Sequence, residues 1–204
     1  MAKRKTVDRR LQRTRALLQQ ALSAMIVEKG YEATTVQDII DRANVGRSTF
    51  YAHFADKETL LLSGIEDLRV FLRQRQAEAL KTSGGSRERG FGFSLPMLEH
   101  AKDHWRLYQA MVGRKSGATV LQRLSAMMAD LVRDDLTALG VRTAPAQRDL
   151  IAHHVAGGFM SVLGWWLEHG AKLTPPEVDA IFRRLVLHGL HAELERDGDG
   201  RRRH

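Results

Sequence analysis

The fold is decided by the stretch Thr35-Val36-Gln37-Asp38-Ile39-Ile40-Asp41-Arg42-Ala43-Asn44-Val45-Gly46-Arg47-Ser48-Thr49-Phe50-Tyr51-Ala52-His53-Phe54. Thr35 is a favoured helix N-cap, and Asp38 stands at the acidic third position of a capping-box-like start. Asn44 tolerates the left-handed backbone that a tight turn between two helices needs, and Gly46 can cap the next helix. The stretch therefore predicts two short helices joined by a turn.

The second of these helices has one apolar face and several polar ones. Phe50 and Phe54 are four residues apart, so they share a face and should lie in the core. The other faces carry hydrogen-bonding groups and one permanent cation, on Arg47, Ser48, Thr49, Tyr51 and His53. This arrangement is typical of a helix-turn-helix, in which the second helix enters the major groove of DNA.

Apolar residues recur at helical spacing through most of the chain, and this periodicity predicts an all-α fold with about nine helices. A polar segment rich in Gly and Ser, residues 81–90, predicts a loop after the fourth helix. Besides the two short helices, the expected helices cover residues 8–29, 57–80, 117–139, 146–169 and 175–194, with one or two more within 94–112.

The composition of the 204-residue chain excludes several classes of protein. The absence of Cys removes disulfides, thiolate nucleophiles and Cys-based zinc sites. The longest uncharged apolar run, residues 155–167, is too short to span a bilayer. The basic start Lys3-Arg4-Lys5 leads into further arginine rather than the apolar stretch of a signal peptide. We therefore expect a cytoplasmic protein with no membrane partner.

The positive charge is concentrated near the N-terminus. The net charge is +8, and residues 1–57 hold 11 Lys and Arg against 6 Asp and Glu. A basic N-terminal segment on a nearly neutral body suggests a polyanionic partner. The alternative is a solvated, disordered arm with no partner.

Two linked elements make residues 10–65 resemble the DNA-binding signature of the TetR family: Phe50-Tyr51-x-His53-Phe54 and Asp56-Lys57-x-x-Leu60. The sequence departs from the family where Ile40, Asn44 and Gly46 stand in place of the frequent Ala, Gly and Ser, although Asn44 and Gly46 keep the backbone chemistry of the turn. The resemblance implies an N-terminal three-helix helix-turn-helix domain followed by a helical ligand-binding and dimerisation domain.

The resemblance also implies roles for individual residues. Arg47, Ser48 and Thr49 would face base edges or nearby phosphates, and Arg47 is the best candidate for a bidentate contact to guanine. Tyr51 would bond a phosphate, and His53 would lie near the same strand. Lys57 would meet phosphate at the start of the next helix, as would Thr34 or Thr35 at the first short helix.

We expect a DNA-binding domain at residues 1–57, which includes the basic arm, and a regulatory and dimerisation domain at 58–195. The polar, charged segment 196–204 predicts a disordered tail. In this family the last two helices form a four-helix bundle with a second subunit, which implies a homodimer. Independently, one short recognition helix offers few base contacts, and two-fold symmetry doubles them.

A ligand pocket in the body would be mostly apolar with a few polar groups. The candidate lining residues are Met97, His100, His104, Trp105, Tyr108, Met111, Met127, Met128, Phe159 and Trp165. Aromatic and Met residues at this spacing are more often plain core residues. His100 and His104 have the spacing of two metal ligands on one helix face, but no third ligand is evident and the HExxH pattern is absent. We therefore predict no metal, cofactor or catalytic residues.

These features predict a repressor that binds a palindromic double-stranded DNA operator and is released by a small-molecule effector. One alternative is a TetR-like DNA-binding protein without a small-molecule effector. Another, from a different class, is a metal-dependent hydrolase built on the face that carries His100 and His104.

Overall fold

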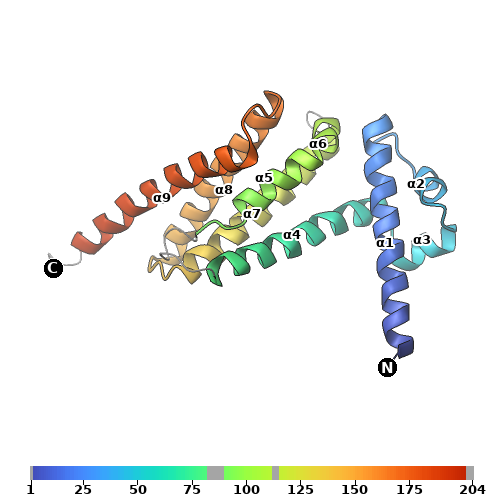
Figure 1. Cartoon of the computed structure of the whole chain (residues 1–204), viewed down its shortest axis with the longest axis horizontal. Coiled ribbons are helices and arrows are strands. Elements are labelled where there is room, and N and C mark those ends of the chain that lie inside the picture. The colour runs from blue at the N-terminus through green and yellow to red at the C-terminus, as the bar shows by residue number, and fades with distance from the viewer. Residues whose placement is uncertain (1, 82–89, 112–114, 201–204) are drawn as a thin grey trace. The chain divides into compact units, whose positions relative to one another are not determined.

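The computed structural model describes residues 2–81, 90–111 and 115–200, and within them it has nine helices and no strand (Figure 1). The all-α prediction is thus confirmed. The helices are α1 (Ala2–Lys29), α2 (Val36–Ala43), α3 (Arg47–His53), α4 (Lys57–Lys81), α5 (Ser94–Asp103), α6 (Trp105–Met111), α7 (Lys115–Ala138), α8 (Pro145–Glu168) and α9 (Pro175–Gly200).

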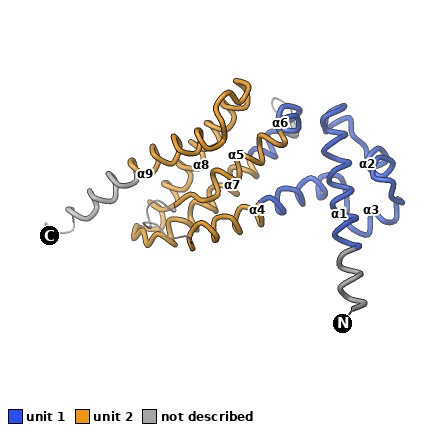
Figure 2. Tube along the Cα trace, in the orientation of Figure 1, with its two compact units in different colours: residues 1–68, 105–121 blue, residues 69–104, 122–204 orange. Residues whose placement is uncertain are grey.

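The chain divides into two compact units (Figure 2). Unit 1 comprises Met1–Leu68 and Trp105–Leu121, so it contains α1 to α3, the first half of α4, α6 and the start of α7. Unit 2 comprises Arg69–His104 and Gln122–His204 and contains the remaining helices. Each unit has its own buried core.

In unit 1 the core is built on α1, which packs against α2 and α6. Leu18, Leu22 and Ile26 follow one another at four-residue steps and are fully buried, as the apolar periodicity predicts. Leu11, assigned to the same face from the sequence, is instead exposed. The helix also begins earlier than expected, at Ala2. It ends at Lys29, and the next residue, Gly30, has a φ of 86° that only glycine adopts readily.

In unit 2 a row of aromatic rings links the N-terminal end of α5 to α8 and α9. Phe93 contacts Phe91 and Phe159 with ring centroids 6.3 and 5.8 Å apart, and Phe159 contacts Phe182 at 5.0 Å. All four rings are buried, and their edge-on geometry is the favoured one for aromatic pairs. This row holds α5 against α8 and α9.

The boundaries of the later helices follow local signals in the sequence. Where one or two helices were expected, the structure has two, α5 and α6, separated at His104. Thr174 precedes α9, and the Glu177 carboxylate accepts hydrogen bonds from the Thr174 N–H and hydroxyl, each at 2.7 Å. The helix extends to Gly200, past the expected end at residue 194, while residues 201–204 of the expected tail lie outside the described residues.

Among the described residues, α8 is the one helix long and apolar enough to cross a membrane by length and composition. It is longer than the apolar run seen in the sequence because it begins ten residues earlier, at Pro145. One face of the helix packs in the core of unit 2, through Ala152, Val155, Ala156, Phe159, Leu163, Trp166 and Leu167. A core helix of a soluble protein passes the same test, so this one helix is weak support for a membrane span.

A buried carboxyl group lies beside the aromatic row. Asp135 on α7 is fully buried, and its Oδ2 accepts the Phe91 N–H at 2.9 Å. Burial raises the pKa of Asp135 from 3.8 to about 6, although hydrogen bonds from Gln76 and Phe91 and the charge of Arg183 act in the opposite direction. The native state therefore binds a proton more tightly at Asp135 than the unfolded chain does.

Asp135→Asn should consequently change how stability depends on pH. Between pH 4 and 6 the native protein holds more protons at this site, so the wild type loses stability as pH rises through about 6. The unfolding free energy of the variant, relative to wild type, should rise by on the order of 2 kcal/mol between pH 4.5 and 7.5. Urea unfolding at both pH values measures this difference, and a difference that does not change with pH would contradict it.

Candidate nucleic-acid interface

The first turn of α2 is fixed by the capping box that the sequence predicts. The Thr35 hydroxyl accepts the Asp38 N–H at 3.2 Å, and the Asp38 carboxylate accepts the Thr35 N–H at 2.7 Å. Lys29 at the end of α1 forms an ion pair of 2.7 Å with the same carboxylate. Hydrogen bonds from Lys29 and then Thr35 hold the pKa of Asp38 far below its ordinary value. The start of α2 is thereby tied to the end of α1.

The turn between α2 and α3 has the backbone that Asn44 was expected to adopt. Asn44 has φ 52° and ψ 50°, in the left-handed region, and its N–H reaches the Asp41 carbonyl at 3.2 Å. The Gly46 carbonyl then accepts the N–H groups of Thr49 and Phe50 and so begins α3. A Cβ at Gly46 would meet no atom closer than 3.8 Å, so a Ser at this position would also fit.

The recognition helix α3 is anchored by its two phenylalanines. Phe50 and Phe54 are buried with ring centroids 6.1 Å apart, and the Arg15 guanidinium lies 5.0 Å from the centre of the Phe54 ring. Tyr51 rests edge-on against Phe50 but keeps half of its surface exposed. Of the other predicted site residues on α3, Arg47 and Ser48 are exposed, and Thr49 and His53 are partly buried.

The Arg47 side chain does not extend alone into solvent. Its Nη2 donates to the Gln37 side-chain oxygen at 2.7 Å, and the Gln37 amide nitrogen donates to the Asp41 carboxylate at 2.7 Å. Both partners lie on α2, so hydrogen bonds between side chains join the two helices. Sequence reasoning missed Gln37, although the four-residue spacing of Gln37 and Asp41 is a recognised helical pairing.

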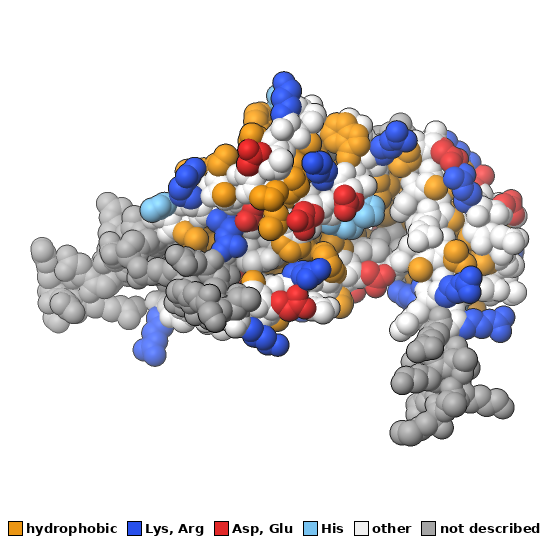
Figure 3. All heavy atoms as spheres, in the orientation of Figure 1, with side chains coloured by type: hydrophobic (Ala, Val, Ile, Leu, Met, Phe, Trp, Pro, Cys, Tyr) orange, Lys and Arg blue, Asp and Glu red, His pale blue; other side chains and the backbone are white. Residues whose placement is uncertain are grey.

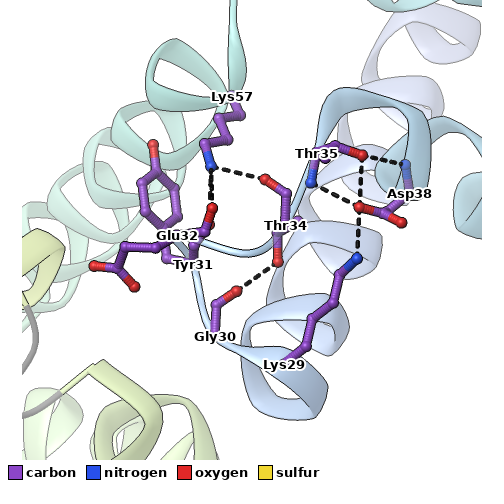
Figure 4. Close-up of polar contacts among 8 residues, drawn as sticks. All are labelled: Lys29, Gly30, Tyr31, Glu32, Thr34, Thr35, Asp38 and Lys57. Atoms are coloured by element: carbon purple, nitrogen blue, oxygen red, sulfur yellow. Dashed lines mark hydrogen bonds and ion pairs between the residues drawn. The ribbon is translucent and has the colours of Figure 1, made fainter.

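Lys57, at the start of α4, reaches back to the turn between α1 and α2 (Figure 4). Its ammonium donates to the carbonyl oxygens of Thr34 and Tyr31 at 2.7 and 2.9 Å and lies 3.4 Å from that of Glu32. It also lies 4.4 Å from the centre of the Tyr31 ring. The Thr34 side chain is buried, and its hydroxyl donates to the Gly30 carbonyl at 2.7 Å. These contacts hold the loop that leads into the capping box.

Lys57→Met should therefore destabilise unit 1. A hydrogen bond to a charged group contributes about 1.5–3 kcal/mol, so we expect the unfolding free energy to fall by about 1–3 kcal/mol. The readout is amide hydrogen exchange at residues 31–36, which should become faster. Lys102, an exposed lysine on α5 in unit 2, is the matched control. If amide exchange at residues 31–36 is equally slow in Lys57→Met and Lys102→Met, Lys57 does not hold this loop.

Two family models match the chain on either side of the middle of α4. The model described as "Bacterial regulatory proteins, tetR family" matches residues 18–63, which include α2 and α3. The model described as "Transcriptional regulator C-terminal region" matches residues 91–188. The chain belongs to the TetR family of transcriptional regulators. It is thus a regulator with a DNA-binding helix-turn-helix, and this family consists of soluble DNA-binding proteins rather than enzymes.

Individual proteins similar to this chain are also transcriptional regulators. Over 65 residues the chain is 45% identical to YxbF of Bacillus subtilis (strain 168), an uncharacterized HTH-type transcriptional regulator, covering 31% of this chain and 17% of that protein. It is 26% identical over 187 residues to the HTH-type transcriptional repressor KstR2 of Mycolicibacterium smegmatis, covering 85% of this chain and 88% of that one. A crystal structure of a TetR regulator from Streptococcus agalactiae 2603V is 25% identical, with a TM-score of 0.61 and coverage of 89% and 98%.

Basic side chains lie on the surface of unit 1, which contains the helix-turn-helix (Figure 3). Some of them already have partners within the chain: Arg42 pairs with Glu28 at 2.7 Å, and Lys29 with Asp38. Arg10 and Arg13 on α1 are exposed. The side chains of residues 2–9, which hold much of the basic arm predicted from the sequence, lie outside the described residues.

The predicted ligand-lining residues are divided between the two units. In unit 2 the His100 and His104 rings stack with centroids 4.2 Å apart. Burial, and to a smaller extent the charge of His104, lowers the pKa of His100 to about 4. Met97, Met127, Met128 and Phe159 are buried in the core of that unit, whereas Trp165 is exposed and stacks on His169 at 4.8 Å.

Trp105, Tyr108 and Met111 belong to unit 1, on α6. Trp105 and Tyr108 are partly buried, Met111 is buried, and burial raises the pKa of Tyr108. Within the described residues, no group of three or more His, Asp or Glu side chains is placed to hold a metal ion. Membership of a family of regulators removes the hydrolase alternative.

Proposed function

We propose that this TetR-family chain is a repressor that binds an inverted-repeat operator as a homodimer. One observation carries the proposal: α3 is anchored through the buried Phe50 and Phe54, while Arg47, Ser48 and Tyr51 face solvent. A short helix with a fixed apolar face and an exposed hydrogen-bonding face fits the major groove of DNA. KstR2, whose name describes it as a repressor, supports the direction of regulation. Binding to chromosomal DNA implies a cytoplasmic protein.

Within this proposal the residues divide between base readout and phosphate contact. Arg47 offers a planar fork of donors that suits the O6 and N7 atoms of guanine, and Ser48 and Thr49 lie beside it. Tyr51 and His53 contact phosphates, which set the register of the helix. For the phosphate at the start of α2, the exposed Thr35 is better placed than the buried Thr34.

Lys57 remains a predicted phosphate contact, but its ammonium already donates to backbone carbonyls. A phosphate would have to share those protons. We therefore propose that Lys57 supports the interface mainly by fixing the loop before Thr35. Loss of Lys57 would then weaken binding to all sequences through that loop.

The dimer would form through the exposed faces of α8 and α9. On α8 the exposed residues Leu150, His154, Gly157, Ser161 and Trp165 follow one another at steps of three or four, so they make one continuous face. On α9 the exposed Ile181 and Leu185 are likewise four residues apart. Large apolar side chains are thus exposed on both helices: Leu150 and Trp165 on α8, and Ile181 and Leu185 on α9. Apolar side chains gathered on a surface are typical of sites that a partner covers.

A groove and two glycines favour a second copy of the chain as that partner. The groove has a volume of about 480 Å³ and lies between α8 and α9, lined by Gln147, Leu150, Ile151, His154, Val155, Leu185, Val186 and Gly189. A Cβ at Gly157 or Gly158 would meet nothing within 4 Å, so these glycines are not needed for packing inside the chain. They would let a helix of a second copy approach closely.

We also propose that the body binds a small-molecule effector that releases the DNA. An effector releases DNA when it prefers a conformation in which the two recognition helices no longer match the half-site spacing. Ligand and operator must then weaken each other's binding by the same factor. His100, partly buried with its pKa near 4, is neutral at physiological pH and can donate or accept a hydrogen bond to such a ligand.

Selection of bound duplexes from a random pool tests the proposed function. The expected result is an enriched inverted repeat whose half-site centres are about 10 base pairs apart, or a multiple of one helical turn. The selected operator can then be used to screen for molecules that release the protein. Enrichment of no sequence, even at low salt, would contradict the proposal.

A further inference from the structure

The side chain of Arg47 is held by two residues of the neighbouring helix α2. Gln37 accepts a hydrogen bond from Arg47 and donates one to Asp41, both at 2.7 Å. Arginine can only donate and an ionised carboxylate can only accept, so the two partners fix which end of the Gln37 amide faces which neighbour. Gln37 is therefore held at both ends, in a single orientation.

In this arrangement Arg47 still has hydrogen-bond donors that can contact a DNA base. A guanidinium has five N–H donors, and Gln37 takes one of them. The remaining donors include a pair on one edge that can form two parallel hydrogen bonds to guanine. An unrestrained arginine side chain carries about 2 kcal/mol of rotamer entropy, part of which binding must remove. A side chain already held by Gln37 loses less entropy when it meets the base.

We propose that Gln37, held by Asp41, is a positioning residue that orients the Arg47 guanidinium and so determines the base specificity of this regulator. This inference rests on the proposed function. It places part of the sequence readout on α2, outside the recognition helix. The contribution to stability is small because all three side chains are exposed. The contribution to base discrimination is larger, since an unheld guanidinium can turn to other acceptors.

The two residues of α2 act differently on affinity. The Asp41 carboxylate faces a polyanion, so its charge opposes binding to any duplex. In Asp41→Asn the side-chain oxygen still accepts the Gln37 amide proton, so base preference should stay the same while affinity for random duplex rises about 2-fold to 5-fold. Asp41→Ala removes the acceptor as well, so affinity should rise but base preference should weaken.

The test uses the full chain and the inverted repeat recovered from the random pool. Affinity is measured for that repeat, for the repeat with the guanine assigned to Arg47 replaced in both half-sites, and for random duplex. For Gln37→Ala we expect discrimination at that base pair to fall about 3-fold to 10-fold, with affinity for random duplex within about 2-fold of wild type. In an Arg47→Ala background, Gln37→Ala should cause no further loss of discrimination.

Different outcomes test the proposed DNA-binding function and the positioning role of Gln37. If the unaltered chain enriches no repeat, the proposed function fails. If the repeat is enriched but Gln37→Ala keeps full discrimination, only the positioning role fails. A loss that persists in the Arg47→Ala background, or falls at another base pair, would mean that Gln37 reads a base itself and would overturn the inference. Thermal unfolding of each variant, which should match wild type, verifies that the exposed substitutions leave the fold intact.

Discussion

Arg47→Ala is expected to lower the affinity for the selected operator by at least about 30-fold and to abolish the preference for guanine at one position in each half-site. A bidentate contact to guanine contributes about 1–3 kcal/mol of discrimination, and a dimer makes it twice. Affinity for random duplex should fall much less, because only one exposed cation is lost per chain. Fluorescence anisotropy with labelled duplexes at about 0.15 M salt measures both quantities.

Two further variants separate geometry from charge. Arg47→Lys keeps the charge but loses the planar fork, so it should retain affinity for random duplex and lose most of the discrimination. Arg123→Ala removes another exposed arginine, on α7 and away from the proposed dimer face, and should leave discrimination unchanged. Should Arg47→Ala behave like Arg123→Ala, Arg47 does not read a base.

Leu185→Asp is expected to convert the protein to a monomer and to reduce operator affinity by roughly 100-fold or more. Leu185 is 68% exposed in the single chain, so the substitution should cost the isolated fold little. In the proposed dimer the carboxylate would be buried in an apolar interface, where an unpaired charge is very unfavourable. A monomer contacts one half-site and loses the added contacts of the second.

Val70→Asp on α4 is the matched control, because Val70 is 59% exposed but lies on neither α8 nor α9. Light scattering coupled to gel filtration gives the mass of each variant, and circular dichroism checks helix content. Val70→Asp should remain dimeric. A Leu185→Asp protein that is still dimeric and fully active would show that the interface lies elsewhere.

The helix-turn-helix could be predicted from the sequence because its determinants are local. Thr35 with Asp38, the left-handed Asn44 and the pair Phe50 and Phe54 each act within a few residues, so their roles follow from spacing alone. The order of the helices along the chain could be predicted for the same reason, because each helix has its own local apolar periodicity.

Contacts between distant segments could not be predicted in this way. The ammonium of Lys57 donates hydrogen bonds to backbone carbonyls some 25 residues earlier in the chain. These bonds depend on how α4 packs against the loop after α1. Leu11 has the spacing of the buried face of α1 but is 45% exposed, because spacing shows which face of a helix is apolar and not how much of that face other helices cover. The burial of Asp135 likewise depends on the position of Phe91, which lies 44 residues away in sequence.

The most direct test of the account changes the spacing of the operator. Inserting 5 base pairs between the two half-sites rotates one by about half a helical turn, so a symmetric pair of α3 helices could no longer reach both on one face of the duplex. Inserting 10 base pairs returns the two half-sites to the same face of the duplex but leaves them one helical turn farther apart. If a symmetric dimer binds both half-sites, each insertion should reduce the affinity to that of a single half-site. Undiminished affinity for the repeat with 5 added base pairs would contradict it.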